Sequence, residues 1–254
     1  MKKSCLAATY YIDADHPEVI SFARESAGQS GSDRQRAVNL FYRVRDGFRY
    51  NPYAFSLEHD KYKASSVLAA GEGFCIPKAI LLAAAARVVG IPARLGFGNV
   101  KNHLATQRLK QLMGSDLFVF HGYTVLFLEN KWVKATPAFN RSLCDKFNTR
   151  PLEFDGRSDA VFHPYDNLGN RHMEYVHDYG VFDDFPMEKM VAETRKYYPA
   201  WFEDVKAATD LIDNHLSGDF EQEAADDAAD DAAADAAADA SGQNTGKKAD
   251  NASD

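Results

Sequence analysis

The fold is decided by the stretch Gly71-Glu-Gly-Phe-Cys-Ile-Pro-Lys-Ala79, which continues as Ile80-Leu-Leu-Ala-Ala-Ala-Ala-Arg-Val-Val-Gly90. The two glycines allow a tight turn, and Pro77 is tolerated only in the first turn of a helix, where its missing N–H has no partner. Alanine and leucine then favour a helix that ends at Gly90. The sequence therefore predicts a helix whose first turn holds Cys75.

A cysteine at this position has two interpretations. Free backbone N–H groups and the positive end of the helix dipole favour an anion there, and a thiolate is such an anion. Free cysteines are also commonly buried as small core residues. The local sequence leaves both interpretations open.

The number and spacing of the cysteines restrict the kinds of site that they can form. Cys5, Cys75 and Cys144 are an odd number with no CxxC spacing, which argues against a disulfide framework and against a thiolate zinc site. We therefore expect no metal and no cofactor, and Cys75 is the candidate nucleophile.

The net charge of −8 resides in the C-terminal tail. From Glu221 onward, ten acidic residues face only Lys247 and Lys248, so the rest of the chain is electrically balanced and nothing indicates a nucleic-acid partner. The tail is mostly alanine and aspartate, which predicts disorder over 221–254, with a residual chance of transient helix. A plain solvated appendage is favoured over an interaction role.

Targeting signals are not evident in the sequence. No apolar run approaches the roughly 20 residues needed to cross a bilayer, so we expect no membrane partner. The start at Met1 has too short an apolar stretch for a secretory signal, so a cytoplasmic location is expected.

The spacing of the apolar residues predicts the remaining helices and strands. Helices are expected from Asp15 or His16 to residue 27, after Ser32 to about Phe48, over 103–113 and over 187–216 with a break at Pro199. Residues 5–12 could form a short edge strand, 95–100 a strand, and 117–128 with 131–135 a β-hairpin. Residues 137–186 are expected to be extended segments and loops that cover the sheet.

The predicted hairpin carries one histidine in an aromatic setting. His121 lies between Phe120 and Tyr123, about 45 residues after Cys75. An isolated histidine on a strand would most simply face solvent. A cysteine at a helix start followed by a strand-borne histidine, however, fits a nucleophile and its base.

A set of motifs is spread over roughly residues 17–140: Val44-Arg-Asp-Gly-Phe-Arg-Tyr50, Gly73-Phe-Cys-Ile-Pro-Lys-Ala79, Ala86-Arg-Val-Val-Gly-Ile-Pro-Ala-Arg94, His121 and Lys131-Trp-Val-Lys-Ala-Thr-Pro137. In these motifs the chain resembles the transglutaminase-like superfamily, which has a papain-like fold. The resemblance implies an α+β core in which the helix carrying Cys75 packs on an antiparallel sheet carrying His121. Members are cysteine-dependent hydrolases or acyl transferases that act on amide bonds.

The resemblance also implies roles for individual residues. Cys75 would be the nucleophile and His121 the base, while Thr136 stands where the family usually has the aspartate that orients the histidine. Asn140 is an alternative orienting residue. The backbone N–H of Cys75 would form an oxyanion hole, with a second donor possible from the Tyr50-Asn51 region.

A second group of polar residues offers a different function. His163, His172, Glu174, His177 and Asp178 lie close together in the sequence, but their spacing matches no standard metal motif. A polar loop that covers the core or rims the site is the favoured interpretation. His103 and Cys144 are assigned to a surface loop and to packing.

These observations predict one domain over residues 1–220, with a core at about 17–140 and a C-terminal extension at 141–220, followed by the tail. The expected function is a cysteine-dependent hydrolase or acyl transferase that acts on a peptide or protein amide through a thioester. The alternative is a binding or scaffold protein that keeps the fold without the chemistry, and a metalloprotein is a weaker third option. The oligomeric state is left open.

Overall fold

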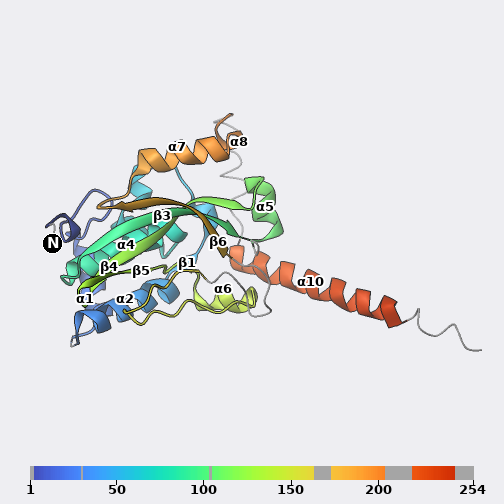
Figure 1. Cartoon of the computed structure of the whole chain (residues 1–254), viewed down its shortest axis with the longest axis horizontal. Helices are drawn as coiled ribbons and strands as arrows, with labels where there is room; N and C mark the ends of the chain where they lie inside the picture. The colour runs from blue at the N-terminus through green and yellow to red at the C-terminus, as the bar shows by residue number, and fades with distance from the viewer. Residues whose placement is uncertain (1–2, 30, 103–104, 163–172, 204–218, 244–254) are drawn as a thin grey trace, which may run out of the picture.

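The computed structural model describes residues 3–29, 31–102, 105–162, 173–203 and 219–243. The fold is α+β: a four-stranded antiparallel sheet in the order β5-β4-β3-β6 packs against a central helix, α4, and further helices surround that helix (Figure 1). The strands are β3 (Ala93–Asn102), β4 (Leu117–Leu128), β5 (Lys131–Ala135) and β6 (Met173–Phe182). The α+β fold class predicted from the sequence is therefore confirmed.

Helix α4 (Cys75–Val88) begins at the cysteine and is buried along almost its whole length. It contacts β4 and β3 on one side and α1, α2 and α3 on the other. Its run of alanines explains this position, because small side chains let the sheet and three helices approach one helix together. The predicted cysteine-bearing helix packed on an antiparallel sheet is thus observed.

Three helices pack behind α4, and the sequence pattern predicted the first two of them. They are α1 (Pro17–Ala27), α2 (Asp33–Gly47) and α3 (Ala64–Ala70). Ser32 caps α2 by accepting a hydrogen bond from the Gln35 N–H, as expected for a serine at this position. A short parallel pair, β1 (Arg49–Tyr50) with β2 (Glu72–Gly73), fixes the chain just before α4.

The predicted hairpin is formed by β4 and β5. Its two connecting residues, Glu129 and Asn130, have φ values of 48° and 65°. Left-handed geometry at both central positions is the turn that best matches the twist of two antiparallel strands.

The N-terminal prediction was wrong. Residues 5–12 form no edge strand, because Lys3–Cys5 is a 3-10 helix (η1) and turns follow it. Two further 3-10 helices, η2 (Pro52–Ala54) and η3 (His59–Tyr62), precede α3. The Thr9 N–H bonds to the Ile12 carbonyl and the Arg87 guanidinium binds the Ala7 carbonyl, so local turns and a side chain take the backbone groups that a strand would pair.

Beyond β3, the structure has the helices expected near 103–113 and from residue 187, and it adds a strand and a short helix that the sequence pattern did not define. β6 pairs with β3 inside the region expected to be loops and extended segments. The helices are α5 (Gln107–Met113), α6 (Arg141–Lys146), α7 (Met187–Tyr197) and α8 (Ala200–Glu203), the last two separated near Pro199 as predicted. The rest of the helix expected over 187–216 lies outside the described residues, as does His103.

The first part of the acidic tail is helical, as its alanine content allowed. Helix α10 (Phe220–Gln243) runs away from the body, as the red helix in Figure 1 shows. Its first turns are held by Phe220, which is 4% exposed, and by Glu221, which binds Asn140 and Ser142. These contacts supply the anchoring that alanine and aspartate alone lack. Residues 244–254 lie outside the described residues.

No helix in the described ranges is long and apolar enough to span a bilayer.

Candidate active site

Cys75 is the first residue of α4, and the glycine turn before it determines its position. A Cβ atom on Gly73 would lie 3.1 Å from the Pro77 Cβ atom, so glycine lets the chain approach the first helical turn. The Asn51 N–H bonds to the Gly73 carbonyl at 3.2 Å and ties the turn to the segment that follows β1. The sequence prediction of a cysteine at a helix start is therefore correct.

The Cys75 thiol is buried, with only 8% of the residue exposed. Burial raises its pKa to about 11, while the backbone N–H groups of Cys75, Ile76 and Gly122 act in the opposite direction. Burial therefore favours the neutral thiol at pH 7.

His121 lies on β4 at a distortion of the sheet. Phe120, the residue before it, has a φ of 62°, a left-handed conformation that bulky residues rarely adopt. The β3–β4 register shifts between Gly98 and Val100, and the Asn99 side chain accepts the Phe120 N–H at 3.0 Å. Bulges of this kind re-aim side chains. Asn99 and Phe120 therefore contribute to the orientation of His121, a role that sequence periodicity did not indicate.

Two aromatic rings hold the imidazole. The centroid of the His121 ring lies 5.1 Å from that of Phe162 and 6.0 Å from that of Tyr175. Its Nε2 atom is buried and makes no hydrogen bond to any described residue. Burial lowers the His121 pKa to about 3, and no carboxylate among the described residues counteracts that effect. The imidazole is therefore neutral at pH 7.

Cys75 and His121 line one cavity of about 80 Å³. Their elements touch beside it, because a Cβ atom on Gly122 would lie 3.1 Å from the Ile76 Cα atom. The structure thus brings the helix start and the histidine-bearing strand together, as the sequence reasoning required.

Thr136 and Asn140, the two candidates for orienting His121, have different environments. The Thr136 side chain is 1% exposed and its hydroxyl makes no hydrogen bond with described residues. Burial raises the pKa of the Tyr175 phenol, and Thr136 is close enough to offset part of that rise. The Asn140 carbonyl oxygen accepts the Tyr50 N–H at 3.0 Å, and its amide nitrogen donates to Ser142 and Glu221. Asn140 therefore supports the Tyr50 backbone and the tail rather than His121.

The same contacts affect the expected oxyanion hole. The Cys75 N–H remains the donor at the helix start. The Tyr50 N–H is bonded to Asn140 and the Asn51 N–H to the Gly73 carbonyl, so these two backbone groups are already engaged in this structure.

Lys78 is a charged residue in the second turn of the cysteine helix whose role the sequence did not reveal. It is fully buried, and its Nζ atom donates to the carbonyls of Arg45, Phe48 and Ala138 at 2.8, 2.6 and 2.7 Å. Burial lowers its pKa to about 7. The side chain connects α4 to the end of α2 and to the segment after β5. It therefore holds these three segments together beside the site. The available sequence signal was a lysine among the apolar residues at the start of α4.

The histidine-rich segment was the alternative site. His163 and His172 lie outside the described residues, whereas Glu174, His177 and Asp178 lie on β6. Within the described ranges no three histidine, cysteine or acidic residues come together as metal ligands.

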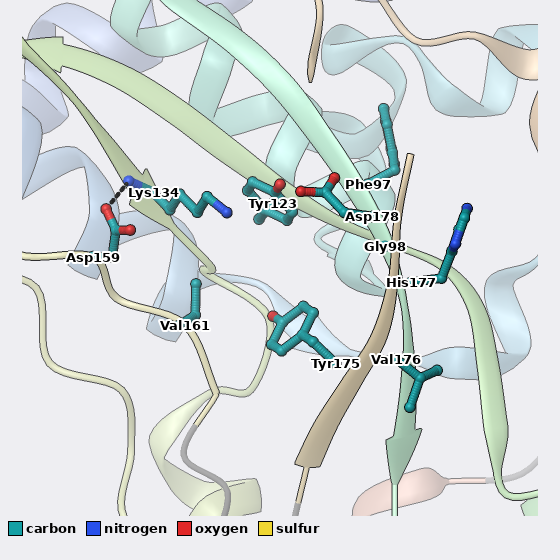
Figure 2. A pocket seen from close by; sticks show the side chains of 10 residues that line it. All are labelled: Phe97, Gly98, Tyr123, Lys134, Asp159, Val161, Tyr175, Val176, His177 and Asp178. Atoms are coloured by element: carbon teal, nitrogen blue, oxygen red, sulfur yellow. Dashed lines mark hydrogen bonds between the residues drawn. The ribbon is translucent and has the colours of Figure 1, made fainter. Parts of the chain in front are cut away.

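A second cavity of about 340 Å³ lies at the outer face of the sheet. Tyr123, Lys134, Tyr175 and Asp178 are among its lining side chains (Figure 2). Tyr175 also contacts the His121 ring, so one wall of this cavity is part of the packing around the histidine.

The chain matches a known protein family over the segment that contains Cys75 and His121. Residues 20–137 match the family model of the transglutaminase-like superfamily. No curated protein matches the chain.

Two solved structures are similar to part of the chain. One is a candidate cysteine protease from Cytophaga hutchinsonii, with 16% identity, a TM-score of 0.41, and coverage of 52% of this chain and 40% of that structure. The other is a candidate protease from Parabacteroides distasonis ATCC 8503, with 15% identity, a TM-score of 0.35, and coverage of 53% and 24%. The chain spans less than half the length of these structures.

The matched segment includes both Cys75 and His121. Over residues 20–137 the chain is therefore similar to the transglutaminase-like superfamily.

Proposed function

We propose that the protein is a cysteine-dependent hydrolase or acyl transferase that acts on amide bonds of peptides or proteins. The observation that carries the proposal is the shared cavity, because Cys75 and His121 are both among its lining residues. Nε2 of His121 is without a hydrogen-bond partner among the described residues, so it is free to accept a proton.

The chemistry follows from these two groups. His121 takes the thiol proton as the Cys75 sulfur attacks the carbonyl carbon, and the N–H of Cys75 supports the developing oxyanion. The C–N bond breaks, the proton passes from His121 to the departing amine, and a thioester remains on Cys75. Water then cleaves the thioester to a carboxylic acid and free thiol, or an amine takes the acyl group and forms a new amide.

The experiment separates the two outcomes and tests the nucleophile. Dye-labelled casein reports hydrolysis, and incorporation of a fluorescent primary amine into casein reports acyl transfer. We expect Cys75→Ala to abolish either activity. Cys144→Ala is the matched control, because Cys144 is also buried with a pKa raised to about 11, yet it does not line the cavity. An unchanged rate in Cys75→Ala would contradict the proposal.

A second candidate is a scaffold protein without catalytic activity. It is favoured by the burial of both groups, which raises the pKa of the Cys75 thiol to about 11 and lowers the pKa of the His121 imidazole to about 3, so that the neutral forms are favoured at pH 7. This candidate predicts that wild type and Cys75→Ala show the same background rate on both substrates, and that no acyl-enzyme is detected by mass spectrometry.

A further inference from the structure

The walls of the Cys75 cavity are uncharged. Beside Cys75 and His121, the described lining comes from η2 and the residues around it, from α5, and from α7 with the segment after it, and it includes no lysine, arginine, aspartate or glutamate. Leu109, Met113, Met190 and Trp201 contribute large apolar surfaces. A group held at the sulfur is therefore surrounded by hydrocarbon and aromatic atoms.

The polar atoms of these walls are mostly engaged by the protein itself. The Tyr198 hydroxyl accepts the Val119 N–H at 3.0 Å and donates to the Leu117 carbonyl. The Trp201 ring N–H donates to the Leu112 carbonyl at 3.1 Å. Because these donors are occupied, they are not available to solvate a polar group that enters the cavity.

The cavity volume limits the size of the group. About 80 Å³ is well below the roughly 150 Å³ of an apolar cavity that accommodates benzene. Met113 and Met190 are flexible and can adjust to a branched aliphatic chain. An aromatic ring would have to displace part of the wall.

We propose that this cavity receives the acyl side chain of the substrate, and that this side chain is uncharged and aliphatic, between alanine and leucine in size. The inference rests on the proposed function, because the acyl group must lie beside the Cys75 sulfur in the thioester. A charged side chain would lose its hydration without gaining a partner, which is strongly unfavourable.

A panel of substrates tests the selectivity. Peptide p-nitroanilides that carry alanine, valine, leucine, phenylalanine, glutamine or glutamate at the acyl position would be compared by kcat/KM. We expect kcat/KM for the leucine or valine substrate to exceed that for the glutamate and glutamine substrates by about 100-fold. It should exceed kcat/KM for the phenylalanine substrate by about 10-fold, in line with the discrimination that apolar pockets achieve. Equal rates for glutamate or glutamine and leucine would overturn the inference.

A second measurement does not depend on turnover. Cys75 would be alkylated with the uncharged N-propyl chloroacetamide and with iodoacetate, and the modified peptide quantified by mass spectrometry, which distinguishes it from Cys5 and Cys144. Each rate is divided by the rate of the same reagent with free cysteine. A relative preference for the uncharged reagent without any amidase activity would reject the proposed function and keep the assignment of the cavity. Amidase activity without that preference would support the proposed function and reject the assignment of the cavity.

Variants of the wall complete the test. Met113→Lys places a cation in the cavity and is expected to shift selectivity toward glutamate and iodoacetate, whereas Met113→Leu keeps the volume and should leave the order unchanged. Trp201→Ala needs no buried charge and enlarges the cavity, so phenylalanine should gain at least threefold relative to leucine. An unchanged phenylalanine-to-leucine ratio in a folded Trp201→Ala protein would contradict the inference.

Discussion

His121 is held by packing where a charged partner would be expected. Phe162 and Tyr175 contact the imidazole ring, and Thr136 occupies the position at which the resemblance leads one to expect a carboxylate. Edge-to-face and tilted ring contacts fix a ring's orientation, but they do not stabilise an imidazolium as an anion does. At the scale of the residue, the open question is therefore the charge that His121 can carry.

A carboxylate placed at residue 136 tests how the charge of His121 depends on its neighbour. Thr136→Asp should raise the pKa of His121 by about 1 to 3 units, because an opposite charge within a few ångströms favours the protonated ring. The measurement is a pH titration of the imidazole by ¹H–¹³C NMR. Thr136→Asn is the uncharged control of the same shape and should leave the His121 titration unchanged. Equal titrations in the two variants would show that residue 136 does not control His121.

The buried histidine also predicts how stability depends on pH. Its pKa is about 3 in the folded state and about 6.5 in the unfolded chain, so between these values the unfolded state binds more protons. The contribution of His121 to stability is therefore complete above pH 6.5 and is lost as the pH falls toward 3, by at most about 1.4 kcal/mol per pH unit. Urea unfolding of His121→Phe should show a shallower decline over this range. His177→Asn, a change at an exposed histidine, should follow wild type.

At the scale of the elements, the approach of β4 to the start of α4 depends on one glycine. Gly122→Ala would place a methyl group 3.1 Å from the Ile76 Cα atom and 3.3 Å from the Phe97 ring, closer than packed atoms normally lie. The helix start and the histidine strand must then separate by a few tenths of an ångström. We expect kcat to fall about 10- to 100-fold, since small displacements of reacting groups are costly.

A glycine-to-alanine substitution at residue 47 is the control for Gly122→Ala. In Gly47→Ala the new methyl group would meet only the flexible end of Arg43, so kcat should not change. The two variants should both remain folded, with Gly122→Ala less stable by about 1 to 3 kcal/mol. An unaltered kcat in Gly122→Ala would mean that the contact does not set the geometry of the site.

Prediction from sequence succeeded where local chemistry was decisive. Proline in a first turn and a run of alanines defined α4, and an aromatic, β-branched pattern with a two-residue connection defined the hairpin. β6 was not defined, because most of its residues are exposed or half-buried and its register with β3 shifts twice, which removes clear alternation. The left-handed Phe120 and the three carbonyls around Lys78 depend on tertiary contacts that no local pattern encodes.

At the scale of the whole molecule, we propose that residues 1–220 fold as one unit and that the start of α10 docks on it. Phe220 packs against Tyr50 and Tyr53, and the Glu221 carboxylate binds the Asn140 amide that also supports the Tyr50 backbone. The Glu223 carboxylate binds the Tyr53 hydroxyl. The tail is thus linked to Tyr50, a residue of the cavity wall.

Two truncations distinguish the docked turns from the rest of the tail. Ending the chain at residue 218 removes Phe220 and Glu221, and the loss of one buried aromatic side chain should destabilise the protein by about 2 kcal/mol. For a chain of this size the melting temperature should fall by roughly 4 to 8 °C. Ending it after Asp230 keeps Phe220, Glu221, Glu223 and Asp227, the last of which accepts the Gln107 N–H at the start of α5. That shorter deletion should leave the melting temperature within about 1 °C of wild type, because surface changes away from such contacts have little effect. Equal melting temperatures for the two truncated proteins, measured by differential scanning calorimetry, would show that α10 does not stabilise the body and that Asn140 holds Tyr50 without it.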